Sequence, residues 1–202
     1  QRYADYSDMM QMLVKQWRMD WNDWNLPFLF VQLPMYLADG EKDDSYWALQ
    51  REQQYIASMM IQNAGMISLA DCGEYDNIHP LDKKTPGERL FQLAKNLVYD
   101  KQGTITATAA QLFSDNGKLY VTFDHLHEKL VMQTANGCPF EISGEDNLFY
   151  PAKADVIHGN MLCISNPAVK FPSAVKYAWY NFGEAVLFTE SGNPVSPFFK
   201  CV

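Results

Sequence analysis

Two kinds of periodicity divide the first hundred residues into helices and buried strands. Apolar side chains recur every three or four positions over residues 3–17, 46–61 and 90–97, and this spacing predicts three amphipathic helices. Residues 28–33 and 66–70 are largely apolar runs of strand length, typical of strands covered on both faces. Because the second helix separates them, the two strands are predicted to pair in parallel. The sequence Thr-Pro-Gly-Glu at 85–88 predicts a capping box, with Pro86 as the first residue of the third helix.

From residue 104 onward the chain changes to short runs in which apolar and polar side chains often alternate. Such runs are typical of antiparallel strands when turn-forming residues separate them, and a series of them predicts a small antiparallel β-sandwich. The runs lie at 105–113, 118–124, 139–143, 152–157, 161–165 and 174–182. The predicted fold class is therefore α/β, with a parallel α/β part over residues 1–100, a β-sandwich over 101–202 and the boundary between 98 and 103.

The acidic balance of the chain limits the class of ligand. The 202 residues carry a formal net charge of -8, and the pI is near 4.9. Nucleic acids and anionic membranes need a basic face that releases their counterions, so neither is an expected partner, and a small or neutral ligand fits better. No apolar run reaches the roughly 18 residues of a membrane span, and no basic segment leads into an apolar stretch as in a signal peptide.

The cysteines and histidines form no strong metal motif, and we predict no metal site. The four cysteines lack Cys-x-x-Cys spacing and are predicted to be free, mostly buried thiols, at Cys72, Cys138, Cys163 and Cys201. Cys138 and Cys163 are a candidate disulfide because both positions fall in the strand-rich half. His125 and His127 could share one side of a strand and bind a metal, but no third and fourth ligand follow at fixed spacing, so a loop or strand edge is the better interpretation. His158 precedes a glycine and is predicted to lie in a turn.

The most distinctive chemical groups lie within residues 65–82, where a strand-length apolar run leads into an acidic loop. The carboxyl ends of parallel strands are where α/β folds keep their sites. Asp76 and His79 are three residues apart, so the carboxylate can fix the tautomer of the imidazole while the imidazole acts as a base. These two residues are two-thirds of a Ser-His-Asp triad. Asp71 could support them, but a structural role is preferred, and Gln32 could either line a cleft or be structural.

The same segment resembles a known family. Asp76-x-x-His79-Pro80, with FLFVQLP at 28–34, WALQREQQ at 47–54 and AVKYAWYNF at 174–182, looks like the sialate O-acetylesterase family of SGNH-type hydrolases. The resemblance runs through most of the chain in the family's order, but it covers only the carboxyl-terminal part of a member. It implies an SGNH-hydrolase-like three-layer α/β domain before the β-sandwich, His79 and Asp76 as catalytic base and acid, and no cofactor. It also suggests a secreted, periplasmic or lysosomal protein, which the chain itself does not reveal.

The nucleophile of such an enzyme is expected outside this chain. A nucleophilic serine needs a tight, glycine-lined turn, and the sequence has neither Gly-x-Ser-x-Gly nor Gly-Asp-Ser. Ser143 and Ser191 precede glycines but are predicted to lie in turns of the β-sandwich. The resemblance implies that the serine motif lies upstream of Gln1. We therefore expect the N-terminal half of the same protein to be a partner, and this chain alone to be inactive. A two-stranded parallel sheet is also expected to need further strands.

Three functions remain open from the sequence. The resemblance implies a carbohydrate esterase that removes O-acetyl groups from sialic acids through an acyl-serine. An acetylxylan-type carbohydrate esterase of similar fold is the alternative. The third possibility is a non-catalytic carbohydrate-binding or structural fragment in which the β part does the binding, although Trp179 is more typical of a sandwich core than of a sugar platform.

Overall fold

The computed structural model describes residues 3–99, 101–134 and 136–202, and these form two units. The first unit ends at Ile105 and the second begins at Thr106, so the change of unit falls just beyond the predicted range of 98–103. The predicted boundary residue 100 itself lies outside the described residues. None of the helices in the described ranges combines the length and apolar character needed to cross a membrane.

The first unit contains the three predicted helices and the two predicted strands. In chain order the elements are a 3-10 helix (Tyr3–Asp5), α1 (Tyr6–Asp20), β1 (Phe28–Val31), α2 (Tyr46–Met60), β2 (Ala64–Ile67) and α3 (Lys84–Leu97). β1 and β2 pair in parallel as predicted, with Phe28 opposite Ala64 and Val31 opposite Ile67. The alternation of side chains along the strands then gives this small sheet two apolar faces.

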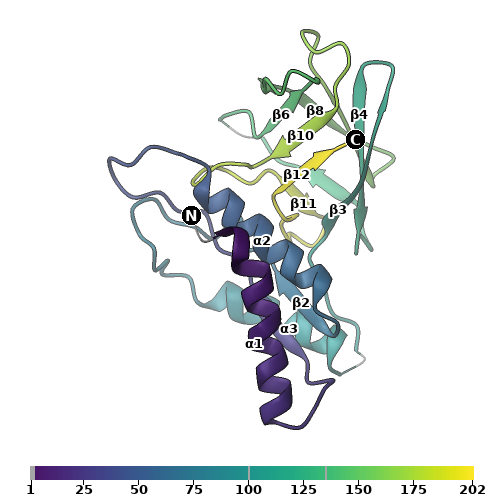
Figure 1. Cartoon of the computed structure of the whole chain (residues 1–202). Helices are drawn as coiled ribbons and strands as arrows, with labels where there is room; N and C mark the ends of the chain where they lie inside the picture. The colour runs from purple at the N-terminus through teal and green to yellow at the C-terminus, as the bar shows by residue number, and fades with distance from the viewer. Residues whose placement is uncertain (1–2, 100, 135) are drawn as a thin grey trace. The chain divides into compact units, whose positions relative to one another are not determined.

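Helices cover both faces of the sheet (Figure 1). On one face, Phe30 and Met66 pack with Val14 of α1 and Ala57 of α2. On the other face, the core consists of Ile67, Leu69 and Leu93, with partly buried neighbours from β1 and α3. Gly65 pairs with Leu29 and faces α3 on this second face, where a Cβ would lie 2.3 Å from Leu97 Cδ1. The absence of a side chain at Gly65 therefore lets α3 approach the sheet closely.

Two predicted boundaries in this unit were wrong. β2 covers residues 64–67 rather than 66–70, because pairing with β1 stops at Ile67 while Ser68, Leu69 and Ala70 stay buried in a loop. The apolar side chains of Leu69 and Ala70 thus reflect burial and not strand pairing. The predicted capping box at 85–88 was also wrong: α3 begins at Lys84, and Asp82 Oδ1 accepts the backbone N–H groups of Lys84 and Thr85, each at 3.0 Å. A carboxylate just before the helix satisfies these free donors and interacts favourably with the positive end of the helix dipole, so Asp82 determines where α3 begins.

The second unit is built from ten strands in its described residues, and every pairing is antiparallel. One four-stranded sheet has the order β12-β10-β6-β7, another has the order β3-β4-β9-β8, and β11 pairs with β5. The bounds are β3 Thr108–Asp115, β4 Lys118–Asp124, β5 Leu130–Met132, β6 Phe140–Ser143, β7 Tyr150–Pro151, β8 Lys153–Ile157, β9 Met161–Ser165, β10 Ala174–Tyr177, β11 Leu187–Thr189 and β12 Phe198–Cys201. The antiparallel prediction is confirmed strand by strand, whereas packing as a sandwich stays a prediction.

Turn residues and an aromatic cluster organise this second unit. Both residues of Asn116-Gly117 and both of His158-Gly159 have positive φ angles, as the central residues of a tight hairpin turn do. The predicted turn at His158 is therefore confirmed. Tyr177 is fully buried, stacks on Phe140 with centroids 4.7 Å apart, and accepts the backbone N–H of Leu187 at 2.8 Å. Trp179 is 9% exposed and packs on Phe199, which agrees with a core role.

Candidate active-site loop

The loops that follow β1 and β2 lie against each other at the carboxyl edge of the parallel pair. The N–H of Asp76 donates to Leu37 O at 2.9 Å, and Asp76 Oδ1 accepts the N–H of Asp39 at 2.8 Å. Tyr75 donates its hydroxyl to Asp39 Oδ1 at 3.1 Å. Gly73 contacts the backbone of Met35 so closely that a Cβ would lie 1.9 Å from Met35 O. The two loops therefore hold each other in position, as expected for a site at this edge of a sheet.

A second set of hydrogen bonds fixes the short stretch that carries His79. Glu74 accepts the N–H of Leu81 at 2.6 Å and the side-chain amide of Asn77 at 2.7 Å. Asn77 in turn accepts the N–H of His79 at 3.0 Å through Oδ1. The backbone hydrogen bond from Leu81 and the side-chain hydrogen bond from Asn77 lower the pKa of Glu74 below its usual value. The Glu74 carboxylate thus stays ionised while it closes this part of the loop.

The two predicted catalytic residues share the loop but are not hydrogen-bonded to each other. Asp76 and His79 are both exposed, and Asp76 has a positive φ of 56°, which Asp tolerates better than most residues. Oδ1 of Asp76 is occupied by Asp39, and no other described residue donates to Oδ2 or bonds the ring of His79. The structure therefore places both groups at the open side of the loop and leaves one carboxylate oxygen and the imidazole available. Their predicted pairing as catalytic acid and base stays a prediction.

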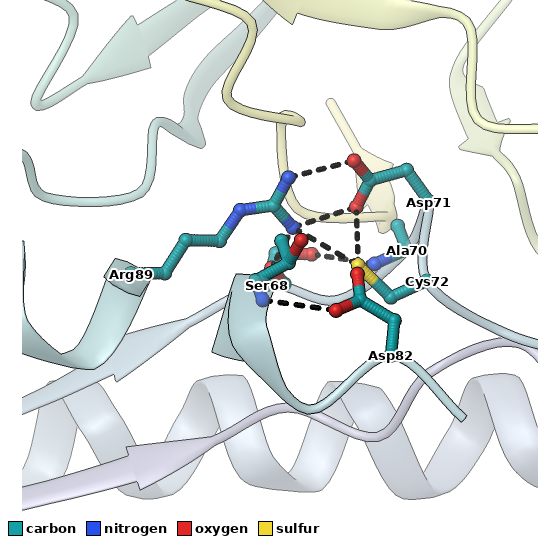
Figure 2. Close-up of polar contacts among 7 residues, drawn as sticks. Ser68, Ala70, Asp71, Cys72, Asp82 and Arg89 are labelled. Atoms are coloured by element: carbon teal, nitrogen blue, oxygen red, sulfur yellow. Dashed lines mark hydrogen bonds and ion pairs between the residues drawn. The ribbon is translucent and has the colours of Figure 1, made fainter. Parts of the chain in front are cut away.

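Arg89 of α3 anchors the start of the loop (Figure 2). Its guanidinium donates to both carboxylate oxygens of Asp71, at 2.6 and 2.7 Å, and also to Ser68 O at 3.0 Å. The side chain of Arg89 is 13% exposed and that of Asp71 is 24% exposed, so the pair is largely shielded from solvent. Burial lowers the pKa of Arg89, but its hydrogen bonds to Asp71 and the charge of that carboxylate raise the pKa above its usual value overall. This bidentate pair agrees with the structural role preferred for Asp71.

Cys72 lies beside this ion pair as a protonated, unreactive thiol. Its Sγ donates to Asp71 Oδ1 at 3.4 Å and accepts from Arg89 at 3.6 Å. Burial, together with the charge of Asp71, raises the pKa of Cys72 to about 12. A thiol with such a pKa has almost no thiolate at neutral pH, so Cys72 has the wrong ionisation state for a nucleophile.

The remaining candidates have structural surroundings. Gln32 is fully buried and donates to Arg51 O at 3.2 Å, so it ties β1 to α2. Ser143 was predicted in a turn, which is wrong: it is a buried residue of β6, because Phe140–Ser143 pairs with β10 up to Ala174. Ser191 does lie in a turn, where its hydroxyl donates to Glu128.

The remaining histidine and cysteine candidates form neither a metal site nor a disulfide in the described parts of the chain. His125 and His127 follow β4 in an exposed loop, as preferred, and the described parts of the chain contain no group of three or more His, Cys, Asp or Glu side chains arranged for a metal. All four cysteines are free, including the pair 138 and 163. The prediction that they are mostly buried was wrong, because Cys138 and Cys201 are exposed and the other two are intermediate.

Sequence reasoning did not identify Arg89, Asp39 or Glu74 as parts of this loop. Arg89 is 18 residues from Asp71, so no local spacing connects them. The available signal was an arginine on the first turns of the helix that follows a loop rich in carboxylates, which favours an ion pair back to the strand end.

Comparison with solved structures gives an informative similarity, whereas two other comparisons found no match. No protein-family model and no curated protein sequence matches the chain. Among solved structures, the chain is similar to the crystal structure of XAC1771, a carbohydrate acetylesterase from Xanthomonas citri, with a TM-score of 0.88 and 32% sequence identity. The match covers 97% of this chain and 46% of that protein, so the chain spans about half the length of its relative. The mixed α/β fold with its three helices is therefore similar to the fold of part of a carbohydrate esterase.

Proposed function

We propose that this chain is the part of a carbohydrate O-acetylesterase that carries the catalytic base and the acid that orients it. The observation that carries this proposal is the match of 97% of the chain, at 32% identity and a TM-score of 0.88, to a carbohydrate acetylesterase. The loop supports it, because exposed His79 and Asp76 share one loop at the carboxyl edge of parallel strands. Since the match covers 46% of that relative, the activity is proposed for the whole esterase and not for this chain alone.

In the proposed mechanism, His79 takes the proton from a serine hydroxyl that the N-terminal half of the protein supplies. The serine oxygen attacks the acetyl carbonyl, and the protonated imidazole gives its proton to the departing sugar oxygen. Water then attacks the acyl-serine with His79 again as base, and acetate leaves. Asp76 Oδ2, which no described residue occupies, accepts the other imidazole N–H and stabilises the charged ring. Backbone amides and an upstream asparagine would bind the oxyanion.

The proposed substrate is an O-acetylated sialic acid, as the resemblance of the Asp76-to-Pro80 segment implies, and acetylated xylan is the competing substrate. In both cases the ester is carried by a sugar hydroxyl, so the chemistry at His79 is the same. What differs is the charge of the sugar, because sialic acid carries a carboxylate and xylan does not.

The partner in this proposal is the N-terminal half, which would add strands to the SGNH-like sheet. The pair β1 and β2 has no third strand among the described residues, and a parallel pair alone is marginal. Large apolar residues are also exposed on α1, in the turn after it and at the end of α2. The exposed fraction of each lies between 44% and 74%, and the residues are Met9, Met12, Leu13, Trp17, Met19, Trp21, Trp24, Met59 and Met60. A hollow of about 270 Å³ lies among Met12, Trp24 and Met60. Apolar surface of this extent is typical of a face covered by further protein.

The test is a hydrolysis assay on the full-length protein with p-nitrophenyl acetate, an O-acetylated sialic acid and acetylated xylan. We expect His79→Ala to lower kcat by about 10⁴-fold or more on every substrate. The matched control is His125→Ala, an exposed loop histidine of the second unit, which should leave the rate unchanged.

Asp76 offers a finer comparison because its two oxygens have different roles. Asp76→Asn keeps an oxygen that can accept the Asp39 N–H but replaces the free oxygen with a donor, so it should lower kcat by about 10²-fold or more and leave loop stability unchanged. Asp76→Ala should lower both. Turnover by the present chain alone that disappears in His79→Ala would show that the chain carries its own nucleophile, and the proposal of an upstream serine would then be wrong.

A further inference from the structure

A polar hollow with aromatic rings at its border lies in the second unit, between the loop that joins β6 to β7 and the loop that joins β9 to β10. Its volume is about 300 Å³, which lies at the lower end of the range for small-molecule sites. Glu145 and Asp146 contribute from the first loop, Tyr150 from the start of β7, and Lys170 and Phe171 from the second loop. All of these residues belong to a single unit, so the hollow is complete within it.

The aromatic rings at this hollow are exposed to an unusual degree. Phe171 is 83% exposed, the highest value for any aromatic side chain described, and Tyr150 is 38% exposed. The face of an aromatic ring is electron-rich and attracts the slightly positive C–H groups on the apolar face of a sugar ring. Two accessible rings at one hollow therefore suit a ligand that has a flat C–H face and polar edges.

The charged groups supply the polar half of such a site. Neither the Glu145 carboxylate nor the Lys170 ammonium has a hydrogen-bond or ion-pair partner in the described chain, and Asp146 uses only Oδ1, which accepts the N–H of Leu148 at 3.1 Å. Carboxylates accept hydrogen bonds from hydroxyl groups, and an ammonium donates to hydroxyl or ether oxygens. With two carboxylates and one ammonium, the hollow is net negative and disfavours an anionic ligand.

Both loops are held in position before any ligand binds. Asn166 donates to Pro151 O at 2.7 Å and so connects the second loop to β7, the strand that follows the first loop, and its Oδ1 accepts the N–H of Ala168 at 2.7 Å. Gly144 lies close to the second loop, since a Cβ there would be 3.3 Å from Phe171 O. Preorganised loops lose little conformational entropy on binding, which favours recognition of a weakly interacting ligand.

We propose that this hollow is a binding site for a neutral sugar unit of a carbohydrate chain, separate from the loop of His79. The choice of a sugar as the ligand class rests on the proposed function. The site would hold an uncharged part of a longer glycan, with the sugar ring against Phe171 and Tyr150 and its hydroxyl groups on Glu145, Asp146 and Lys170.

The test is isothermal titration of the purified chain with lactose, cellohexaose and xylohexaose as neutral probes and with N-acetylneuraminic acid as the anionic probe. We expect saturable binding of at least one neutral probe below about 20 mM, and at least about fivefold weaker binding of N-acetylneuraminic acid. Phe171→Ala should weaken the neutral binding by about tenfold or more. Phe171 is so exposed that its removal should not affect folding, which circular dichroism checks.

Two further variants sharpen the test. Phe113→Ala is the matched control, because Phe113 is an exposed aromatic residue of β3 that does not line the hollow, and it should bind normally. Glu145→Gln should weaken neutral binding and reduce the discrimination against N-acetylneuraminic acid. The inference is overturned if no neutral probe binds, if Phe171→Ala binds as tightly as the parent chain, or if N-acetylneuraminic acid binds equally well. None of these outcomes depends on ester hydrolysis, so failure of this inference is distinguishable from failure of the proposed esterase activity.

Discussion

Replacing Arg89 is the most direct perturbation of the loop that carries Asp76 and His79. Arg89→Ala removes two hydrogen bonds to Asp71, one to Ser68 O and a long one to Cys72 Sγ. Fully exposed ion pairs contribute about 0–1 kcal/mol, whereas loss of one partner from a buried pair costs about 3–5 kcal/mol. With side-chain exposures of 13% and 24%, this pair lies between these limits. We therefore expect Arg89→Ala to lower the free energy of unfolding of the first unit by about 2 kcal/mol, and Arg89→Lys, which keeps the charge but not the bidentate geometry, by about 1 kcal/mol.

The assay is urea unfolding followed by tryptophan fluorescence. Four of the five tryptophans, Trp17, Trp21, Trp24 and Trp47, lie in the first unit, so the signal reports mainly on that unit. A double-mutant cycle with Asp71→Asn isolates the pair, and we expect a coupling energy of about 1–2 kcal/mol. Amide hydrogen exchange should also accelerate at Asp76 and His79, because the strand end that carries their loop is no longer tied to α3.

The matched control is Lys84→Ala on the same helix. The ion pair of Lys84 with Glu88 is 3.6 Å long, and its side chains are 83% and 65% exposed, so its loss should cost less than about 0.5 kcal/mol. If Arg89→Ala is no more destabilising than Lys84→Ala, or if the coupling to Asp71 is near zero, the ion pair does not stabilise the loop and the reasoning is refuted.

Two other predictions follow from the same loop. In the folded state the pKa of Cys72 is raised to about 12, so its neutral thiol favours folding below the unfolded pKa of about 8.5, and this contribution is lost as pH rises toward 12. Cys72→Ala should therefore flatten the fall in stability between about pH 9 and 11. At pH 8, Cys72 of the parent chain should react with a thiol reagent far more slowly than exposed Cys201. Gly73→Ala should lower the free energy of unfolding by about 3 kcal/mol, because its Cβ would lie 1.9 Å from the backbone oxygen of Met35, which cannot move away easily. Gly87→Ala is its control, because apart from the nearby backbone of α3 itself nothing lies within 4 Å of that Cβ. An alanine in α3 should stabilise by up to about 1 kcal/mol, so equal effects of the two substitutions would contradict the steric argument.

The elements that sequence predicted well are those that local periodicity determines. The three helices and the parallel pair in the first unit follow from the spacing of apolar side chains and from the crossover between the strands. In the second unit the six alternating runs all contain strands, but β5, β7, β11 and β12 were missed. These four are only two to four residues long, and a run of that length is too short to show a period.

What sequence could not predict depends on contacts between residues far apart in the chain. The end of β2 at Ile67 is fixed by where β1 stops pairing, and Leu69 and Ala70 beyond it are apolar because the loop is buried. In the same way, Asp82 starts α3 although Thr85 fits the local capping pattern, since Asp82 accepts both available N–H groups. The partnership of Arg89 with Asp71 exists only once α3 has packed on the sheet.

The distribution of hydrogen bonds within the loop separates its structural groups from the groups available for chemistry. Both oxygens of Glu74, both ends of the Asn77 amide and both oxygens of Asp71 bind other parts of the first unit. Of the ionisable side chains between 71 and 79, Asp76 keeps a carboxylate oxygen and His79 keeps its whole ring without a partner in the described chain. Buried or shielded polar groups need partners, whereas a group that must exchange protons with a reactant has to stay accessible. The loop therefore uses its other polar side chains to hold itself together and keeps this acid and this base accessible. Accessibility is one requirement of the proposed esterase mechanism, and the pairing of Asp76 with His79 stays a prediction.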